Sequence, residues 1–436
     1  MSNQSNRVGA EGYASTPLSY NITSAKLYSN VINPKKNYNI DIKALIAGFE
    51  GTESINSPTV EYTIKLGDSF NLLERMKITG GEKIELKIER RLKSGPKRYT
   101  IVCYLGEIID YKKSGTATAT YVLKCYSKHV MNEAVSILTK PFRGTAGKVI
   151  KGILENDLEV TPHYIEQSGS SVIEGIFPRI KPLHAIIWLM RNAFDDGTPY
   201  YFYETLKDGL YYRSYKSMLE EDVAEEYKFK SFMVNAKESE EGYEEERTMV
   251  TKLSSPSIGY SKFIDASSGA FASTLHAVDI STKEYEKFKF NSENNRLNRL
   301  NKNKPYALND RTKVLNRGYN EHSDAKNFFV STNRKAFSGR NYYSTADINF
   351  NKAMAHIENL NFQTHEITIP GNFDLCVGKK IKLVVYRNKE DTEGAGIDKA
   401  QSGTYLVSQI THRFEDGYSQ ELVIQKDSGD LNYETA

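Results

Sequence analysis

The chain has 436 residues, of which 39% are hydrophobic and 26% charged, as in an ordinary soluble globular protein of about three domains. Its formal net charge of +3 excludes a protein built throughout to bind polyanions. The N-terminus lacks the apolar core of a signal peptide, and the longest apolar run, residues 185–190, is too short to cross a membrane. We therefore expect a protein without a membrane segment that is made in a cytoplasm.

The first part of the chain is predicted to be β-structure. Residues 1–20 are rich in Ser, Asn and Gly and are expected to be disordered. Up to residue 128, apolar residues then alternate with polar ones in at least six short runs that Gly, Asn and Pro separate. So many strands in a segment of about 110 residues favour a closed or sandwiched antiparallel sheet, and residues 21–128 are predicted to form a first β-barrel.

The next segment, residues 129–230, is predicted to be an α+β insertion. Its hydrophobic period changes to that of a helix, with a short helix ended by Pro141, a second capped by Thr145 and a third that starts at Pro182. Two aromatic runs joined through Lys207-Asp208-Gly209 then predict a hairpin.

Residues 231–360 are predicted to be a second insertion, in which an acidic run precedes a basic one. Strands are expected within residues 269–279 and 285–290, and a helix near residues 354–360. The basic stretch from Arg296 to Arg317 has few interleaved aromatic residues, which disfavours a nucleic-acid surface. A solvated loop, or an intersubunit contact with the acidic residues 238–246, is the preferred interpretation.

The C-terminal region, residues 361–428, repeats the pattern of the first barrel, and residues 429–436 form a tail. The first repeated strand matches at an offset of 297 residues and two later strands match at an offset of 301. The matched residues are Ile84, Leu86 and Ile88 with Ile381, Leu383 and Val385, then 104–105, 109 and 121–123 with 405–406, 410 and 422–424. Chance agreement of alternating Val, Ile and Leu is the alternative. Because three strands keep their order, we interpret the pattern as one antiparallel module present twice, the second copy being a second β-barrel.

The predicted fold class is therefore α+β, mainly β, with two similar antiparallel β-barrel modules in one chain and α+β insertion domains between them. Turns that define this fold are expected at five glycines: Gly80, Gly81, Gly371, Gly378 and Gly403. The three cysteines, Cys103, Cys125 and Cys376, fall in predicted strands of the repeated module and are expected to be buried and reduced.

No catalytic, cofactor or metal site is predicted. The pattern that starts at His365-Glu366 lacks the second histidine of a zinc protease, because Ile369 stands in its place. Residues 144–149 resemble a phosphate loop but carry Val149 where Ser or Thr would hold magnesium, so Gly144-Thr145 is interpreted as a helix start. The histidines are scattered, and the adjacent pair Asp195-Asp196 does not define a glycosidase site.

A series of motifs in order along residues 25–428 resembles the central baseplate hub protein of contractile-tailed bacteriophages. The motifs are residues 68–73 and 78–82, Lys181-Pro182 before the aromatic hairpin, residues 269–279, residues 369–372 with 377–378, and residues 403–412 with Tyr418. The segment 291–350 departs from the family by being longer and more basic.

This resemblance implies a non-catalytic structural protein of the virion tail baseplate, made in the host cytoplasm, without a cofactor. It implies a homotrimer whose six barrels adapt a six-fold tail tube to a three-fold central spike. The implied partners are further copies of the chain, the tail tube protein, the central spike protein and other baseplate proteins, with passing contact to DNA in the channel. The expected assembly interface is the loop Asp68, Ser69, Phe70, Asn71, Leu72 and Leu73.

Other functions remain open at this point. The chain could be a tail-associated cell-wall hydrolase, the hub domain of a non-phage contractile injection system, or a protein that holds DNA with its basic stretch. Injection-system relatives fuse a spike after the hub. Here the chain ends eight residues after Ser428, so we expect the spike to be a separate chain.

Overall fold

The computed structural model describes most of the chain. The described residues are 17–32, 34–92, 95–114, 118–167, 172–190, 197–230, 245–257, 267–280, 282–292, 297, 299–301, 313–314, 317–318, 321–332, 348–386 and 396–429. The predicted disordered segment 1–20 and the predicted tail 429–436 lie outside these ranges, apart from residues 17–20 and 429.

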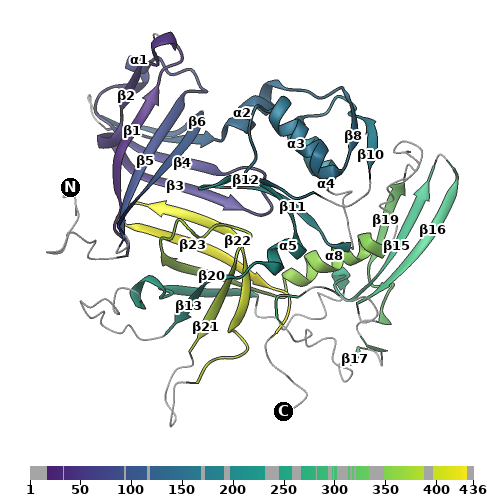
Figure 1. The fold of residues 1–436 in the computed structure, drawn as a ribbon. Helices are drawn as coiled ribbons and strands as arrows, with labels where there is room; N and C mark the ends of the chain where they lie inside the picture. The colour runs from purple at the N-terminus through teal and green to yellow at the C-terminus, as the bar shows by residue number, and fades with distance from the viewer. Residues whose placement is uncertain are drawn as a thin grey trace.

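One large, mainly antiparallel sheet organises the described residues (Figure 1). Its thirteen strands are β1 (Asn21–Tyr28), β2 (Asn39–Asp41), β3 (Ile46–Ser54), β4 (Glu61–Asp68), β5 (Lys83–Leu92), β6 (Gly95–Ser114), β7 (Thr118–Tyr126), β13 (Val223–Phe229), β14 (Lys252–Ser257), β20 (Gln363–Pro370), β21 (Lys380–Val385), β22 (Gly403–Phe414) and β23 (Tyr418–Lys426). They run in the order β14-β20-β23-β22-β3-β4-β7-β6-β5-β1-β2, with β21 beside β22 and β13 parallel to β21. The prediction of a mainly β, α+β chain is confirmed.

Two groups of four strands in this sheet have the same order. We call β4 to β7 unit 1 and β20 to β23 unit 2; their strands lie side by side as β4-β7-β6-β5 and β20-β23-β22-β21. All pairs within the two units are antiparallel. A further strand flanks each unit on both sides. β3 lies beside β4 as β14 lies beside β20, and β1 lies beside β5 as β13 lies beside β21.

The registers of the two units share an irregularity. In unit 1 one residue, Gly106, is extra where β6 faces β7, and in unit 2 Ser408 is extra where β22 faces β23. Such a β-bulge leaves one residue unpaired and increases the local twist. A Cβ on Gly106 would overlap the Tyr126 ring, so a larger residue in this bulge would have to displace that ring.

The bulges correct the sequence alignment. When the bulges are aligned, each residue of β6 next to the bulge corresponds to the residue of β22 that is 302 positions later. Cys125 of β7 and Ile424 of β23 then occupy the same register position, so these two strands have an offset of 299 residues. The predicted offset of 301 for both strands is wrong by one and two residues. The predicted offset of 297 for the first strand agrees with the registers, in which Ile84 lies opposite Cys103 and Ile381 opposite Tyr405.

The two units are joined in one sheet because β3 pairs with β22 over residues 49–54 and 409–414. In Figure 1 this junction lies where the purple strands meet the yellow ones. Strand pairing among the described residues closes neither unit into a barrel, because the sheet ends at β2 on one side and at β14 on the other. One open sheet therefore replaces the two separate barrels that the sequence predicts.

Residues 128–220 form the predicted helical and hairpin segment. It contains α2 (Lys128–Val135), β8 (Pro141–Gly144), α3 (Ala146–Asn156), β9 (Tyr164–Ile165), β10 (Ile173–Ile176), α4 (Pro182–Met190), β11 (Tyr200–Thr205), β12 (Gly209–Ser214) and α5 (Tyr215–Glu220). Thr145 caps α3 by accepting a hydrogen bond from Lys148 N, and Pro182 opens α4, as predicted. The hairpin β11–β12 lies between the helices and the large sheet (Figure 1).

A smaller sheet carries the strands predicted near residues 269–290. It consists of β16 (Glu284–Asn291), β15 (Ala272–Asp279) and β19 (Asn327–Thr332), against which α8 (Ile348–Leu360) packs. β17 (Lys313–Val314) and β18 (Arg317–Gly318) form a separate ribbon, and short 3₁₀ turns occupy residues 34–36 and 43–45.

Buried side chains gather in three clusters among the described residues. One fills unit 1, one fills unit 2 and one lies between the helices α2 to α4 and the hairpin β11–β12. The three cysteines are buried and free, as expected, but Cys376 lies in the loop before β21 and not in a strand.

Candidate functional site

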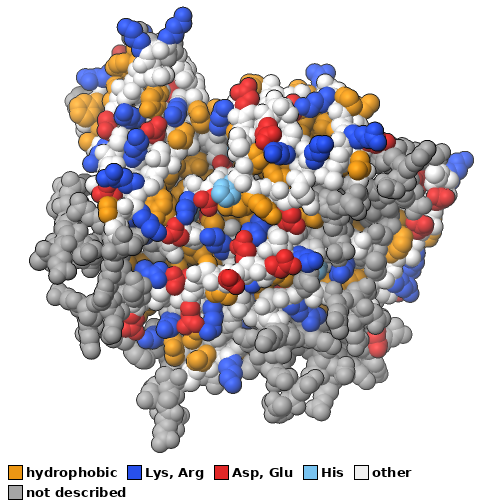
Figure 2. All heavy atoms as spheres, viewed as in Figure 1, with side chains coloured by type: hydrophobic (Ala, Val, Ile, Leu, Met, Phe, Trp, Pro, Cys, Tyr) orange, Lys and Arg blue, Asp and Glu red, His pale blue; other side chains and the backbone are white. Residues whose placement is uncertain are grey.

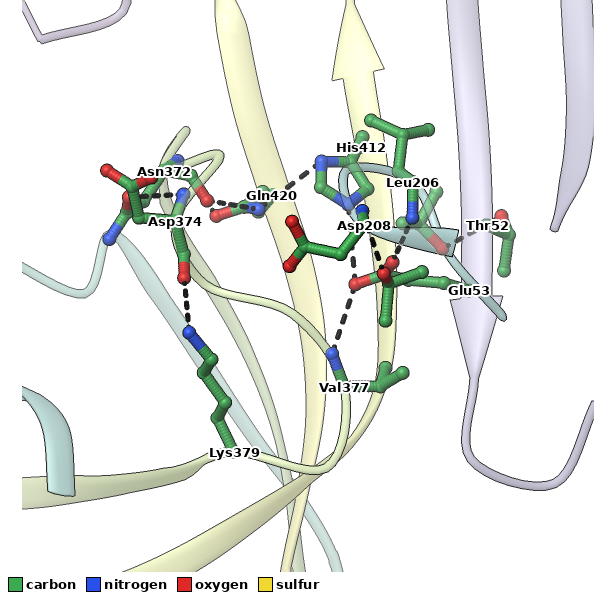
Figure 3. Close-up of polar contacts among 12 residues, drawn as sticks. Thr52, Glu53, Leu206, Asp208, Asn372, Asp374, Val377, Lys379, His412 and Gln420 are labelled. Carbon is green, nitrogen blue, oxygen red and sulfur yellow. Dashed lines mark hydrogen bonds and ion pairs between the residues drawn. The ribbon is translucent and has the colours of Figure 1, made fainter. Parts of the chain in front are cut away.

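The junction between the two units holds a buried polar network that includes Glu53 on β3. The Glu53 side chain is 1% exposed. Its Oε2 accepts a hydrogen bond of 2.7 Å from Leu206 N in the turn of the β11–β12 hairpin, and its Oε1 accepts one of 3.1 Å from Val377 N in the loop before β21 (Figure 3). One carboxylate thus joins three chain segments, and a buried carboxylate needs such partners.

A chain of polar side chains continues from Glu53 through unit 2. His412 Nε2 lies 3.7 Å from Glu53 Oε1, and His412 Nδ1 lies 2.9 Å from the Tyr418 hydroxyl. Gln420 exchanges two hydrogen bonds of 2.9 Å with the backbone of Asn372, so its amide acts like a strand partner of the loop. Figure 3 shows Glu53, His412 and Gln420 lying side by side across the junction.

A second buried carboxylate fixes the hairpin to unit 1. Glu204 Oε2 accepts hydrogen bonds from Val60 N at 2.8 Å and from Ser127 Oγ at 2.6 Å, and His129 Nδ1 lies 3.9 Å from Oε1. Burial raises the pKa of Glu204, an effect that the nearby His129 and the two hydrogen bonds partly oppose. The Glu204 carboxylate therefore has a structural role, because donors of the same chain already bond to it.

Aromatic rings from unit 2 enter the core of unit 1. Phe373 is 2% exposed and stacks on Tyr99 of β6 with ring centroids 4.0 Å apart. Phe414 and Tyr418 belong to the same cluster, and their rings stack at 4.2 Å. Because buried aromatic pairs contribute a large apolar area, the loop after β20 is held by packing as well as by hydrogen bonds.

Arg90 ties the N-terminal segment to the same junction. Its guanidinium donates hydrogen bonds to the carbonyls of Gly371 and Pro17, and it lies over the Tyr418 ring at 5.0 Å. Tyr418 N in turn donates to Leu18 O at 2.7 Å. Residues 17–18 therefore cross the β22–β23 turn and join both units.

The predicted assembly loop lies at the opposite end of unit 1. Asp68 is buried and accepts hydrogen bonds from Phe70 N, Leu72 N and the Tyr121 hydroxyl, the longest being 3.0 Å. Leu72 starts the helix α1 (Leu72–Met76) and is buried, and Leu73 packs partly against the core. Ser69, Asn71 and Phe70 face solvent, with Phe70 53% exposed. The loop is thus a rigid support for an exposed aromatic ring.

Four of the five predicted turn glycines adopt positive φ angles that favour glycine: Gly80 (99°), Gly81 (79°), Gly378 (81°) and Gly403 (138°). Gly371 is required for a different reason. A Cβ there would lie 2.1 Å from the Tyr418 ring.

Comparison with solved structures identifies the fold. The chain matches a tail protein of Neisseria meningitidis MC58 with a TM-score of 0.53 at 11% identity, over 94% of this chain and 97% of the other. It matches the 43 kDa tail protein of prophage MuSo2 from Shewanella oneidensis with a TM-score of 0.54 at 9% identity, over 94% and 99% of the two chains. The chain has the fold of phage tail proteins. No family model and no curated protein sequence matches it.

In this tail-protein fold, the residues of the two motifs that resemble catalytic sites have structural roles. His365 lies in β20, where it contacts Ser255 Oγ at 2.8 Å, and Thr145 serves as a helix cap. Among the described residues no group of three or more His, Cys, Asp or Glu could hold a metal ion, and no helix there has the length and apolarity to span a membrane. The pair Asp195-Asp196 lies outside the described residues.

The basic stretch is described only in part. Arg296, Arg311 and most of the residues between them lie outside the described ranges, as do residues 238–244 of the acidic run. Within the stretch, Asn301 is buried and exchanges hydrogen bonds of 3.1 Å and 3.0 Å with the backbone of Thr404 in β22. On the face shown in Figure 2, basic and acidic side chains are interspersed.

Proposed function

We propose that this chain is the subunit of a baseplate hub, a structural protein of the phage tail that assembles without catalysis. The hub is a homotrimer in which each chain contributes two similar modules, unit 1 with its flanking strands and unit 2 with its own. Three chains then present six similar surfaces around one axis, which a six-fold tail tube can contact on one side while a three-fold spike contacts the other.

The observation that carries this proposal is the shared organisation of the two units within a tail-protein fold. Their four strands have the same order and the same antiparallel pairing, and each has a one-residue bulge in its third strand along the chain. Bulges are retained features of a fold, so their coincidence favours duplication over chance. Only a chain with two copies of a module can offer six comparable surfaces from three subunits.

The partners follow from this arrangement. Edge strands and loops of the two units, including residues 68–73, are proposed to contact the tail tube protein, and the insertions between the units to contact the spike and other baseplate proteins. DNA passes through the channel. The proposed domains keep the predicted boundaries at residues 21–128, 129–230, 231–360 and 361–428, and the proposed location is the virion.

Sedimentation equilibrium tests the proposal. Three copies of 49.4 kDa give 148.2 kDa, and we expect this species to form reversibly as the protein concentration rises. A monomer throughout a wide range of concentration contradicts the trimer. Electron microscopy of tails labelled through this chain should then find the label at the end of the tube where the baseplate lies.

A further inference from the structure

In the part of the chain that the structure describes, unit 1 leaves part of a strand edge without a partner where unit 2 has one. β6 pairs with β5 only as far as Tyr104, and Leu105 bonds with the backbone of residues 81–82. Within the described chain, residues 107–114 of β6 then pair with β7 alone. The corresponding edge of β22, residues 409–414, is covered by β3. An unpaired edge is a template for another strand.

Beside unit 2, one edge of β14 has no strand partner among the described residues. β14 flanks β20 as β3 flanks β4, since Leu253 lies opposite Ile367 and Phe49 opposite Ile64. β3 uses its other edge to pair with β22, whereas β14 pairs in the described residues with β20 only. A β14 strand would therefore meet residues 107–114 of β6 in the way that β3 meets β22.

The β-bulges of β6 and β14 lie at matching positions. β6 has a bulge opposite β7, where two residues of β6, Asp110 and Tyr111, face a single residue of β7. β14 has the same kind of bulge opposite β20, where two residues of β14, Ser255 and Pro256, face a single residue of β20. When the edges of these two strands are aligned through the β22–β3 register, the one extra residue of β6 lies opposite the one extra residue of β14, so the ladder keeps its register on both sides of this position.

An exposed ring marks the same contact. The register of β4 with β7 and of β20 with β23 sets an offset of 303 residues, as between Ile64 and Ile367, which makes Phe70 the counterpart of Phe373. Phe373 is 2% exposed because it enters the neighbouring unit of its own chain, whereas Phe70 is 53% exposed. The next unit that could cover Phe70 belongs to a second copy.

We infer that copies of this chain join by repeating their internal junction: β14 of one copy adds to residues 107–114 of β6 in the next, and Phe70 packs against the unit that supplies β14. The contact is head-to-tail, as a closed ring of three requires. This inference rests on the proposed trimer and names the surfaces that form it.

Cysteine cross-linking of the full chain tests the register. Arg413 lies opposite Glu50 across the internal junction, and the registers make Lys112 and Ser254 their counterparts. We expect the double variant K112C/S254C to form covalent dimers and trimers on oxidation at least about tenfold more than either single variant or the control pair K112C/K43C, because a disulfide needs a short Cβ separation. Lys112, Ser254 and Lys43 are all exposed, so folding is retained.

A second variant tests the ring. Phe70→Ala should weaken self-association about tenfold or more, as loss of a central aromatic anchor does. Phe329→Ala is the control, because Phe329 on β19 is also exposed, at 75%. A trimer that neither cross-links through K112C/S254C nor responds to Phe70→Ala overturns this inference and leaves the proposed hub intact. A monomer at all concentrations overturns both.

Discussion

The loop after β4 and the loop after β20 start from the same position in their units, yet they lie in different surroundings. Residues 69–82 project from unit 1 with Phe70 in solvent. Residues 371–379 are enclosed, with Phe373 stacked on Tyr99, Val377 N bonded to Glu53 and Asn372 bonded to Gln420. The difference comes from the neighbour and not from the unit, because among the described residues only the second loop has another unit of the same chain against it.

This contrast shows how two units with the same strand order can use the same loop position for different roles. In unit 2 the loop is part of an internal core, with buried polar partners that are costly to lose. In unit 1 the loop is held from within by Asp68 and its three hydrogen bonds, and its aromatic residue Phe70 is exposed. The same position therefore serves stability in one unit and, under the proposed assembly, association in the other.

The largest expected effect distinguishes the two phenylalanines. Phe373→Ala should lower the free energy of unfolding by about 3–5 kcal/mol, because it removes a buried ring and leaves a cavity between the units. Phe70→Ala should change it by at most about 0.5 kcal/mol in the dissociated protein, as exposed substitutions do. Urea unfolding of both variants at low protein concentration measures the difference. Equal losses in the two variants would show that the loops are not in different surroundings.

Part of this organisation is readable from the sequence. The alternation of apolar residues predicts the strands of both units, and Thr145 and Pro182 mark the starts of α3 and α4. These signals are local, since strand and helix periods and caps depend on neighbours in the chain. The two bulges are not local. They appear only when β6 and β22 are paired, so the sequence offset of 301 missed them.

The junction residues escaped prediction for the same reason. Glu53 looks like one more polar residue of a strand, and nothing nearby shows that Leu206 and Val377 donate to it. Buried carboxylates depend on contacts distant in sequence. Phe70 and Phe373 did carry a usable signal: each follows its strand by a similar distance, and an alignment of β4 with β20 would have related them.

An intermediate effect concerns His365, which occupies in β20 the position of Tyr62 in β4. Burial, with the nearby Lys426 ammonium, lowers the pKa of His365 to about 4, below the usual value of about 6.5. The unfolded chain therefore binds a proton at a pH where the folded chain does not. The contribution to stability is fully present above about pH 6.5 and falls by about 3 kcal/mol as the pH drops to about 4.

The variant His365→Gln should lose this part of the pH dependence while it keeps a polar partner for Ser255. Urea unfolding of the wild type and the variant at both ends of the window gives the difference. Some acid sensitivity remains in both proteins, because burial also lowers the pKa of His356, to about 3. Parallel pH profiles for the two proteins would contradict the assignment to His365.

The smallest effect is expected at Asp374, the counterpart of Asn71 in the exposed loop. Its carboxylate pairs with Lys207 at 2.6 Å and Lys97 at 2.8 Å and is 47% exposed. Partial burial opposes its ionisation, but the two lysines prevail and lower its pKa to about 2. The pairs therefore stabilise the fold above about pH 4, the usual value of Asp, and the contribution is lost as the pH falls toward 2.

Because solvent screens these ion pairs, Asp374→Asn should cost no more than about 1 kcal/mol near neutral pH, and less at high salt. A double-mutant cycle with Lys207→Met isolates the pair from other effects of either substitution. A much larger coupling, insensitive to salt, would mean that Asp374 is a buried anchor like Glu53. In that case the enclosed loop would depend on charge as much as on the packing of Phe373, and its contrast with the exposed loop would need a second cause.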